Sequence, residues 1–227
     1  MRLNKFIASA GYCSRRQADI LIEKGKVKVN GKIAILGKDV DETKDRVEVE
    51  NKRIYLNDEK IYIIFNKPRG YVTTTNDERG RKTIYYIVKL KQRLFSVGRL
   101  DIATEGLLLL TNDGKFANDL MHPSKKIEKT YIAKVKGEIT EEKINQLIAG
   151  VKIDEYITKP AKVRRVGPDE LEIIISEGKN RQVRKMCEAV KLDISKLRRT
   201  KVGSLELKGL KIGEYRKLTT EELQSLL

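Results

Sequence analysis

A charged pair lies between two apolar segments of the chain. Arg99 and Asp101 fall in the stretch FSVGRLDIATEGLLLLTNDG, which runs from Phe95 to Gly114. The flanking residues have strand composition, so the pair is predicted at the rim of a sheet, where a ligand can reach it. A carboxylate placed there can act as a nucleophile or as a general base. A second interpretation is that Asp101 caps a turn and pairs with Arg99 at the surface.

A tyrosine follows in the alternating segment EKTYIAKV, residues 128–135. The alternation predicts a half-buried strand with Tyr131, Ala133 and Val135 on one face. A tyrosine on an inward face can stack on a nucleobase and offer its hydroxyl to a nearby proton transfer. The alternative is that Tyr131 is an ordinary core residue, and its spacing taken alone favours this alternative.

Basic residues gather in EGKNRQVRKMCEAV, residues 177–190. The apolar spacing predicts a helix that buries one face, with Arg181 and Arg184 near its start and directed toward the rim of the sheet. A helix N-terminus with arginines can hold a phosphate or a carboxylate.

The chain as a whole is strongly basic. It has 227 residues, 48 Lys and Arg against 32 Asp and Glu, a net charge of +16 and a pI near 9.7. Such an excess favours a polyanionic partner, and nucleic acid is the commonest one. An acidic membrane surface is the rival partner, but the cations lie in separate segments and not on one amphipathic helix.

The N-terminal region looks like a module of its own. Apolar spacing predicts a helix ending at Gly11, a second helix with Ser14 as its N-cap, and a small hairpin around residues 27–33. A linker is expected around residues 51–59, followed by a buried strand at 61–65 with Lys67 and Arg69 on the loop after it. Short helices are expected over 83–90 and 140–149, and strands over 151–153, 161–166 and 171–175.

Several of these segments match one known family. VGRLDIATEGLLLLTNDG, NKPRG, EKTY and EGKNRQVRKMCEAV with the later KLRR resemble the bacterial ribosomal pseudouridine synthases, most closely the large-subunit members. RLNKFIASAGYCSRRQADILIEKGKVKVNGK resembles the S4 RNA-binding domain. The resemblance covers nearly the entire chain, with one departure: Lys191 stands where the family usually has Gly, which puts the local helix stop in question.

The resemblance assigns roles to individual residues. It implies that Asp101 is the catalytic carboxylate, that Arg184 pairs with it, and that Tyr131 belongs to the same site. Leu197 would pack under the target base. Because a paired uridine must be flipped out of its helix, Arg99 would fill the gap that it leaves. Whether Asp101 attacks the sugar or takes a proton from it stays open.

We therefore expect an α+β protein with a small helical S4 module at 1–59 and a catalytic domain at 60–227, built on a mostly antiparallel mixed sheet with peripheral helices. Isomerising a uridine gains and loses no atom, so no cofactor and no metal are expected, and the single His122 and the distant Cys13 and Cys187 suggest no metal site. The residues expected to bind RNA are all cationic: Arg2, Lys5, Arg15, Arg16, Lys28, Lys32, Lys67, Arg69, Lys179, Arg181, Lys185 and Arg198.

The expected function is site-specific formation of pseudouridine in ribosomal RNA, with large-subunit RNA favoured over small-subunit RNA. The expected partner is ribosomal RNA or a ribosome assembly intermediate. We expect a cytoplasmic monomer with no membrane association. Two other functions are weighed: a non-catalytic S4-type assembly factor, and an S4-bearing methyltransferase, which the absence of a glycine-rich cofactor loop disfavours.

Overall fold

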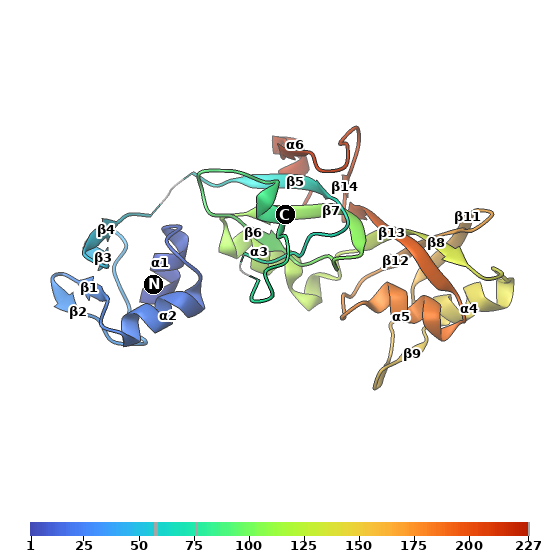
Figure 1. The fold of residues 1–227 in the computed structure, drawn as a ribbon, viewed down its shortest axis with the longest axis horizontal. Helices are drawn as coiled ribbons and strands as arrows, with labels where there is room; N and C mark the ends of the chain where they lie inside the picture. The colour runs from blue at the N-terminus through green and yellow to red at the C-terminus, as the bar shows by residue number, and fades with distance from the viewer. Residues whose placement is uncertain (57–58, 76, 227) are drawn as a thin grey trace. The chain divides into compact units, whose positions relative to one another are not determined.

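The structure is a computed structural model, and it describes residues 1–56, 59–75 and 77–226 (Figure 1). The chain forms two compact units, each described here by itself. The first contains Met1–Ile61, Leu90–Leu94 and Thr111–Gly114, and the second contains the rest. Helices and largely antiparallel sheets occur in both, which confirms the expected α+β class. Within the described residues, no helix is both long and apolar enough to span a membrane.

The first unit combines two helices with a small sheet. α1 (Leu3–Ser9) and α2 (Arg15–Glu23) form as predicted, and the Gln17 amide donates to the Ser14 hydroxyl at 3.2 Å, which caps α2. Helices and strands share one apolar core. The antiparallel strands, in the order β2-β1-β3-β4, are β1 (Val27–Val29), β2 (Lys32–Ile33), β3 (Val47–Val49) and β4 (Lys52–Ile54).

The prediction of a linker around residues 51–59 is wrong for the first part of that range. Residues 52–54 form β4, where Val49 of β3 pairs with Lys52. This strand is too short and too charged for an alternation to reveal it. Residues 57 and 58 of the expected linker lie outside the described residues.

A nine-stranded sheet dominates the second unit. Its main path runs β11-β12-β8-β13-β7-β5-β15, with β14 beside β13 and β6 beside β7. β13 pairs with β7 in parallel and with β8 antiparallel. The strands are β5 (Tyr62–Lys67), β6 (Phe95–Val97), β7 (Thr104–Thr111), β8 (Lys129–Lys136), β11 (Lys162–Gly167), β12 (Glu170–Ile175), β13 (Asp193–Val202), β14 (Leu205–Glu206) and β15 (Tyr215–Lys217).

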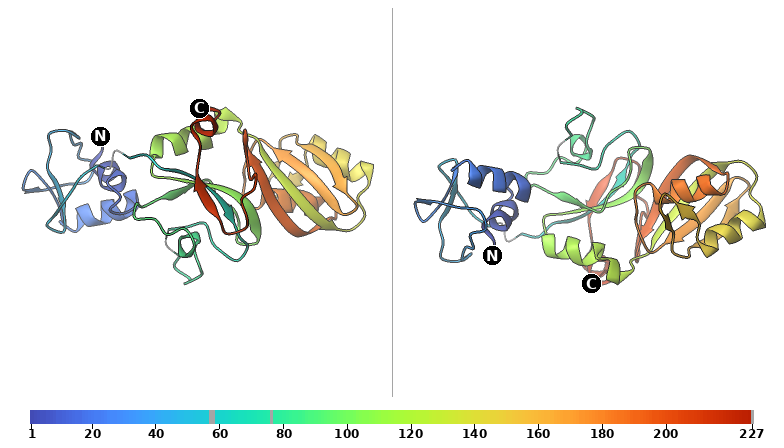
Figure 2. Two further views of the ribbon diagram at one scale, coloured as in Figure 1. Left: turned by 90° about the horizontal axis from the view of Figure 1, so that it is seen from above. Right: turned by 90° about the horizontal axis from the view of Figure 1, so that it is seen from below.

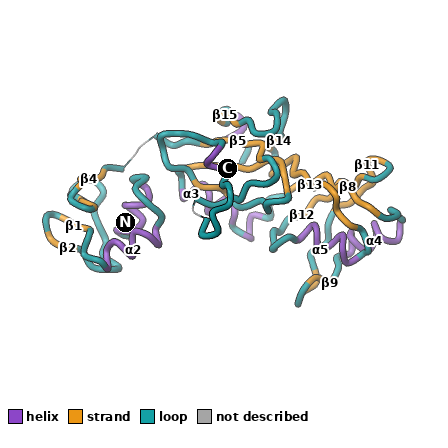
Figure 3. Tube along the Cα trace, viewed as in Figure 1, coloured by secondary structure: helices purple, strands orange, loops and turns teal. Residues whose placement is uncertain are grey.

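Helices and a hairpin border this sheet. α4 and α5 lie on the same face of the sheet around β8, β12 and β13 (Figure 2). The short helix expected over 83–90 is limited to one 3₁₀ turn, and most of the described residues between β5 and β6 are loop (Figure 3). The remaining elements are η1 (Ile84–Tyr86), α3 (Gly114–Met121), η2 (Pro123–Lys125), α4 (Glu141–Ala149), β9 (Lys152–Ile153), β10 (Tyr156–Ile157), α5 (Gln182–Ala189) and α6 (Thr220–Gln224).

The close approach of β7 and β13 depends on a glycine. Gly106 of β7 has a φ of +112°, and a Cβ at this position would lie 2.2 Å from the carbonyl oxygen of Arg199. Because no larger residue fits, glycine permits the parallel pairing that brings β13 beside β7.

Helix α5 ends just before Lys191, although this residue stands at the position where the family usually has glycine. The helix ends at Ala189, and Lys191 takes the left-handed conformation, with a φ of +58°, that glycine usually supplies. The Leu192 amide then donates to the Cys187 carbonyl at 2.9 Å, which closes the helix end.

Candidate active site

Hydrogen bonds hold the backbone carbonyls of the loop that carries Asp101. Each carbonyl oxygen from Leu100 to Thr104 accepts at least one hydrogen bond. Thr73 donates to Leu100 at 2.7 Å and the Gly70 amide donates to Ile102 at 2.8 Å. A loop fixed in this way holds its side chains in place before a substrate arrives.

Lys67 lies under this loop and not at the RNA surface. It is the last residue of β5 and has no exposed surface, so the expectation that it binds RNA from a loop is wrong. Its ammonium donates to the carbonyls of Pro68, Asp101 and Thr104 at 3.0, 3.2 and 2.9 Å. Burial lowers the pKa of Lys67 to about 8, although the Asp101 charge acts in the opposite direction.

Arg184 also supports the loop. Its guanidinium donates to the carbonyls of Ala103 at 2.9 Å and Ile194 at 3.3 Å. Among the described residues Asp101 forms no ion pair, so the expected pairing with Arg184 is not formed. Burial and the charge of Arg181 lower the pKa of Arg184, and the Asp101 charge raises it.

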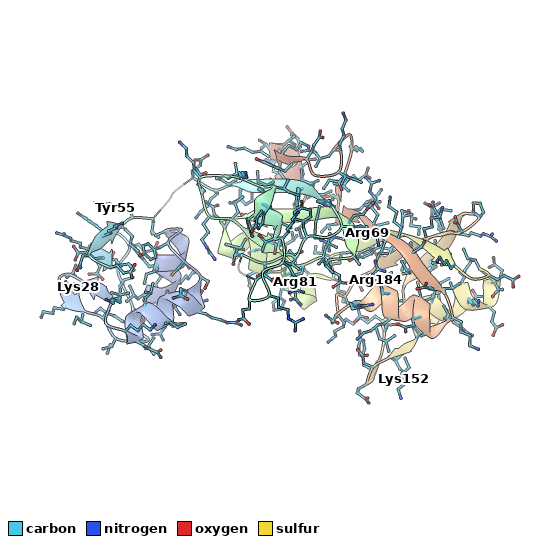
Figure 4. All side chains as sticks on the ribbon, viewed as in Figure 1. Lys28, Tyr55, Arg69, Arg81, Lys152 and Arg184 are labelled. Carbon is cyan, nitrogen blue, oxygen red and sulfur yellow. The ribbon has the colours of Figure 1, made fainter. Side chains whose placement is uncertain are left out.

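Arg69 and Arg184 lie close together near β13 (Figure 4). Arg69 is exposed and donates to the Ser195 carbonyl at 3.4 Å, while its charge lowers the pKa of Arg184. The two cations form a positive edge beside the Asp101 loop. Lys152, in contrast, lies away from them on the β9–β10 hairpin (Figure 4).

A cavity of about 860 Å³ brings most of the predicted site together. Asp101, Tyr131, Leu197 and Arg99 all line it, although they come from separate parts of the sequence. Asp101 is half-buried, and its carboxylate makes no hydrogen bond in the part of the chain that the structure describes. The alternative in which Asp101 caps a turn and pairs with Arg99 is therefore not observed.

Tyr131 and Leu197 form the inner wall of this cavity. Both are buried, with 8% and 3% of their surface exposed. They come from the adjacent antiparallel strands β8 and β13, where Leu197 pairs with Ala133, two residues from Tyr131. The two interpretations of Tyr131, core residue and cavity residue, thus describe one position: it is buried by the sheet and faces the cavity.

Arg199 belongs to this cavity as well, although no role was predicted for it from the sequence. This residue of β13 is 5% exposed, lines the cavity, and donates to the Leu107 carbonyl at 2.8 Å. Its guanidinium carbon lies 6.0 Å from the centre of the Tyr131 ring. Alternation with Leu197 would have placed it on the cavity face, had 193–202 been recognised as a strand.

The remaining predicted RNA contacts differ in exposure. Arg2 and Lys28 have protein partners, with Arg2 paired to Asp39 at 3.3 Å and Lys28 bonded to Asn51 at 3.1 Å. Lys185 pairs with Asp154, and Arg198 is half-buried. Arg2 lies at the surface, as do the remaining seven: Lys5, Arg15, Arg16, Lys32, Arg69, Lys179 and Arg181. Of these, Lys179 and Arg181 line the cavity.

Taken together, these features define a class of protein. A basic chain with Asp101, Glu177 and Tyr131 in a cation-lined cavity of this size fits an enzyme that modifies a nucleic acid. No group of three metal-ligating side chains occurs among the residues described.

Comparisons with known proteins identify the family. The family described as RNA pseudouridylate synthase matches residues 61–189, and the S4 domain matches residues 1–47. The chain belongs to the RNA pseudouridylate synthase family, and the resemblance found in the sequence is confirmed.

Similar proteins align with nearly the whole chain. The ribosomal large subunit pseudouridine synthase B of Bacillus subtilis is 44% identical over 233 residues, which cover 99% of this chain and 95% of that protein. The dual-specificity RNA pseudouridine synthase RluF of Escherichia coli K12 is 40% identical over 100% of this chain and 78% of that protein. A crystal structure of pseudouridylate synthase is 33% identical, covers 100% of both chains and has a TM-score of 0.75.

Proposed function

We propose that this protein converts one uridine of large-subunit ribosomal RNA to pseudouridine. One observation carries the proposal: Asp101, Tyr131, Leu197 and Arg99 meet in one cavity, in a chain 44% identical to a protein named for large-subunit RNA. The reaction breaks the bond between N1 of uracil and C1′ of ribose, turns the base, joins C5 to C1′ and releases the C5 proton. N1 takes up a proton in exchange, so the composition of the uridine does not change.

Asp101 supplies the carboxylate that this reaction needs at the ribose. It acts as the nucleophile at C1′ or as the base that takes a proton from the sugar, and both roles need an ionised group in a fixed position. The hydrogen bonds that hold the carbonyls of residues 100–104 provide that position. Tyr131 and Leu197 hold the detached base, and Tyr131 accepts the C5 proton in the last step.

The exposed cations bind the RNA. Arg99 lies exposed at the cavity and fills the gap left by the flipped uridine. Arg181 and Lys179 contact phosphates at the same cavity, and Arg15 and Arg16 do so from the N-terminal unit. We assign residues 1–59 to RNA binding and 60–227 to catalysis, which the family matches at 1–47 and 61–189 support. The protein acts as a monomer in the cytoplasm.

The test measures pseudouridine in 23S and 16S RNA transcripts incubated with purified protein. We expect one modified position in 23S RNA and none in 16S RNA. Asp101→Asn should lower the rate at least ~1000-fold without changing RNA affinity, because it removes the reacting group and keeps the shape. Glu188→Gln, which removes an exposed carboxylate from α5, is the matched control. RNA bound by the wild-type protein without any pseudouridine would overturn the proposal and leave an assembly factor.

A further inference from the structure

Arg199 is a buried cation without an anionic partner. Its side chain is 5% exposed, and within the described ranges no carboxylate lies within ion-pair distance of it. Its protein contacts are the Leu107 carbonyl at 2.8 Å and the Tyr131 hydroxyl at a long 3.5 Å. A buried charge without a counter-ion is costly, and an anionic ligand that reached the guanidinium would offset that cost.

The cavity is the place where that anion can arrive. Arg199 lines it together with Asp101 and Tyr131. Of its terminal nitrogens, Nη1 makes only the long contact with Tyr131, and Nη2 donates to no acceptor among the described residues. The guanidinium therefore presents donors to a ligand beside the Tyr131 ring, whose centre lies 6.0 Å from its central carbon.

Four other cations in this region are less suited to meet that anion. Arg184 is engaged by the carbonyls of Ala103 and Ile194 and does not line the cavity. Lys129 lines the cavity, but its ammonium donates to the Ile127 carbonyl at 2.8 Å. Arg181 and Lys179 are exposed, where phosphates are the expected ligands. Arg199 is buried between Tyr131 and Leu107, where the base and not the phosphate backbone has to lie.

The proposed reaction creates an anion at that place. When the bond between N1 and C1′ breaks, its electron pair leaves with the base, and the negative charge spreads over N1, O2 and O4 of uracil. The charge on the base disappears when C5 bonds to C1′, and N1 takes up a proton as the C5 proton leaves. Donors that are already oriented toward a developing charge in a cavity shielded from water lower the barrier to its formation.

We propose that Arg199 is a further catalytic residue, which donates to a carbonyl oxygen of the detached uracil and stabilises its negative charge. The proposal rests on the proposed function. It assigns to Arg199 the stabilisation of the leaving base, whereas Asp101 acts at the ribose and Tyr131 removes the C5 proton. A guanidinium suits this task because it stays charged at any physiological pH and presents several donors in a fixed plane.

The test uses two RNA substrates that differ at one atom. A 5-fluoro substituent withdraws electrons and makes uracil a better leaving group, so a residue that stabilises the uracil anion should matter less. Loss of the starting nucleoside is measured in single turnovers, because 5-fluorouridine carries fluorine in place of the C5 hydrogen and cannot complete the final step. Arg199→Gln should slow the reaction of uridine at least ~100-fold. Its defect with 5-fluorouridine should be at least ~5-fold smaller.

Two further variants keep the test decisive. Arg199→Lys retains the charge and should show a smaller defect than Arg199→Gln with uridine. If the Gln variant does not fold, the Lys variant carries the same comparison of substrates. Lys201→Gln removes one charge from the same strand, at a residue that pairs with Glu206 and does not line the cavity, and should match the wild type.

The outcomes separate this inference from the proposed function. Equal defects of an Arg199 variant on both substrates would show a purely structural role and overturn the inference. Wild-type protein that converts neither RNA would overturn the proposed function itself. A reduced defect on 5-fluorouridine, with Lys201→Gln unaffected, would support the assignment of Arg199 to the leaving base.

Discussion

The ammonium of Lys67 donates a hydrogen bond to the carbonyl oxygen of Asp101 at 3.2 Å, from a position with no exposed surface. The same ammonium bonds to the carbonyls of Pro68 and Thr104, so one cation joins the end of β5 to both ends of the loop around Asp101. A buried charge thereby fixes the backbone of the residue proposed to react.

The rate of pseudouridine formation should fall above about pH 8, the pKa to which burial lowers Lys67. Lys67 is charged below this pH and neutral above it, and a neutral amine has two N–H donors for three carbonyls. We expect a roughly 10-fold decline in single-turnover rate from about pH 7 to about pH 9.5. The arginine of Lys67→Arg stays charged, so the single-turnover rate of this variant should not change with pH over this range, whatever its absolute value. The same decline in both proteins would contradict this role.

Arg184→Lys should slow the reaction by roughly 10- to 100-fold with little change in KM. A lysine keeps the positive charge near Asp101, but it lacks the planar fork that reaches the Ala103 and Ile194 carbonyls. Steady-state kinetics measure the effect. Arg164→Lys, the same change in an exposed arginine of β11, should leave both constants unchanged. A wild-type rate for Arg184→Lys would show that charge alone is sufficient.

Gly106→Ala should lower the free energy of unfolding by about 3 kcal/mol or more. The new Cβ would lie 2.2 Å from the Arg199 carbonyl oxygen, at a φ of +112° that L-residues rarely adopt. Urea unfolding of the purified protein measures the change. Gly114→Ala serves as the control, since a Cβ there meets no atom within 4 Å, and its effect should stay within about 1 kcal/mol. Equal stability of the two variants would show that β7 and β13 can separate without cost.

Lys191→Gly should stabilise the protein by about 1 kcal/mol. Lys191 has a φ of +58°, which costs energy for a side chain with a Cβ and little for glycine. The midpoint of thermal unfolding should rise by roughly 2–4 °C. Lys191→Ala removes the same side chain and keeps the Cβ, so it should give no such gain. Identical midpoints for Gly and Ala would exclude relief of backbone strain as the cause.

The identity of the family could be predicted from the sequence because its signals are local. The segment around Asp101, the EKTY segment and the N-terminal helix pair each combine turn, strand or helix chemistry within a few neighbouring residues. The predicted strand around Tyr131 and both N-terminal helices are present in the structure. Asp101 and Tyr131 lie on one cavity, as the resemblance implied, although their catalytic roles remain proposals.

Predictions from the sequence failed for residues whose surroundings come from distant segments. Lys67 in NKPRG resembles a loop cation, yet three carbonyls from its own neighbour and from the loop around Asp101 surround it. Residues 193–202 carry lysines and arginines that mask their alternation, and no strand was predicted for them. They form β13, which pairs with β7, β8 and β14.

The sequence by itself determined the class of the protein, its basic charge and the residue types available for chemistry, since these depend on composition and on contacts between near neighbours. Only the tertiary structure decided which cations are buried and what they meet: Lys67 and Arg184 on backbone carbonyls, and Arg199 facing the cavity without a counter-ion. The physical reason is that burial and electrostatic partners arise from strand pairing between segments up to about 150 residues apart, and no local pattern encodes that pairing.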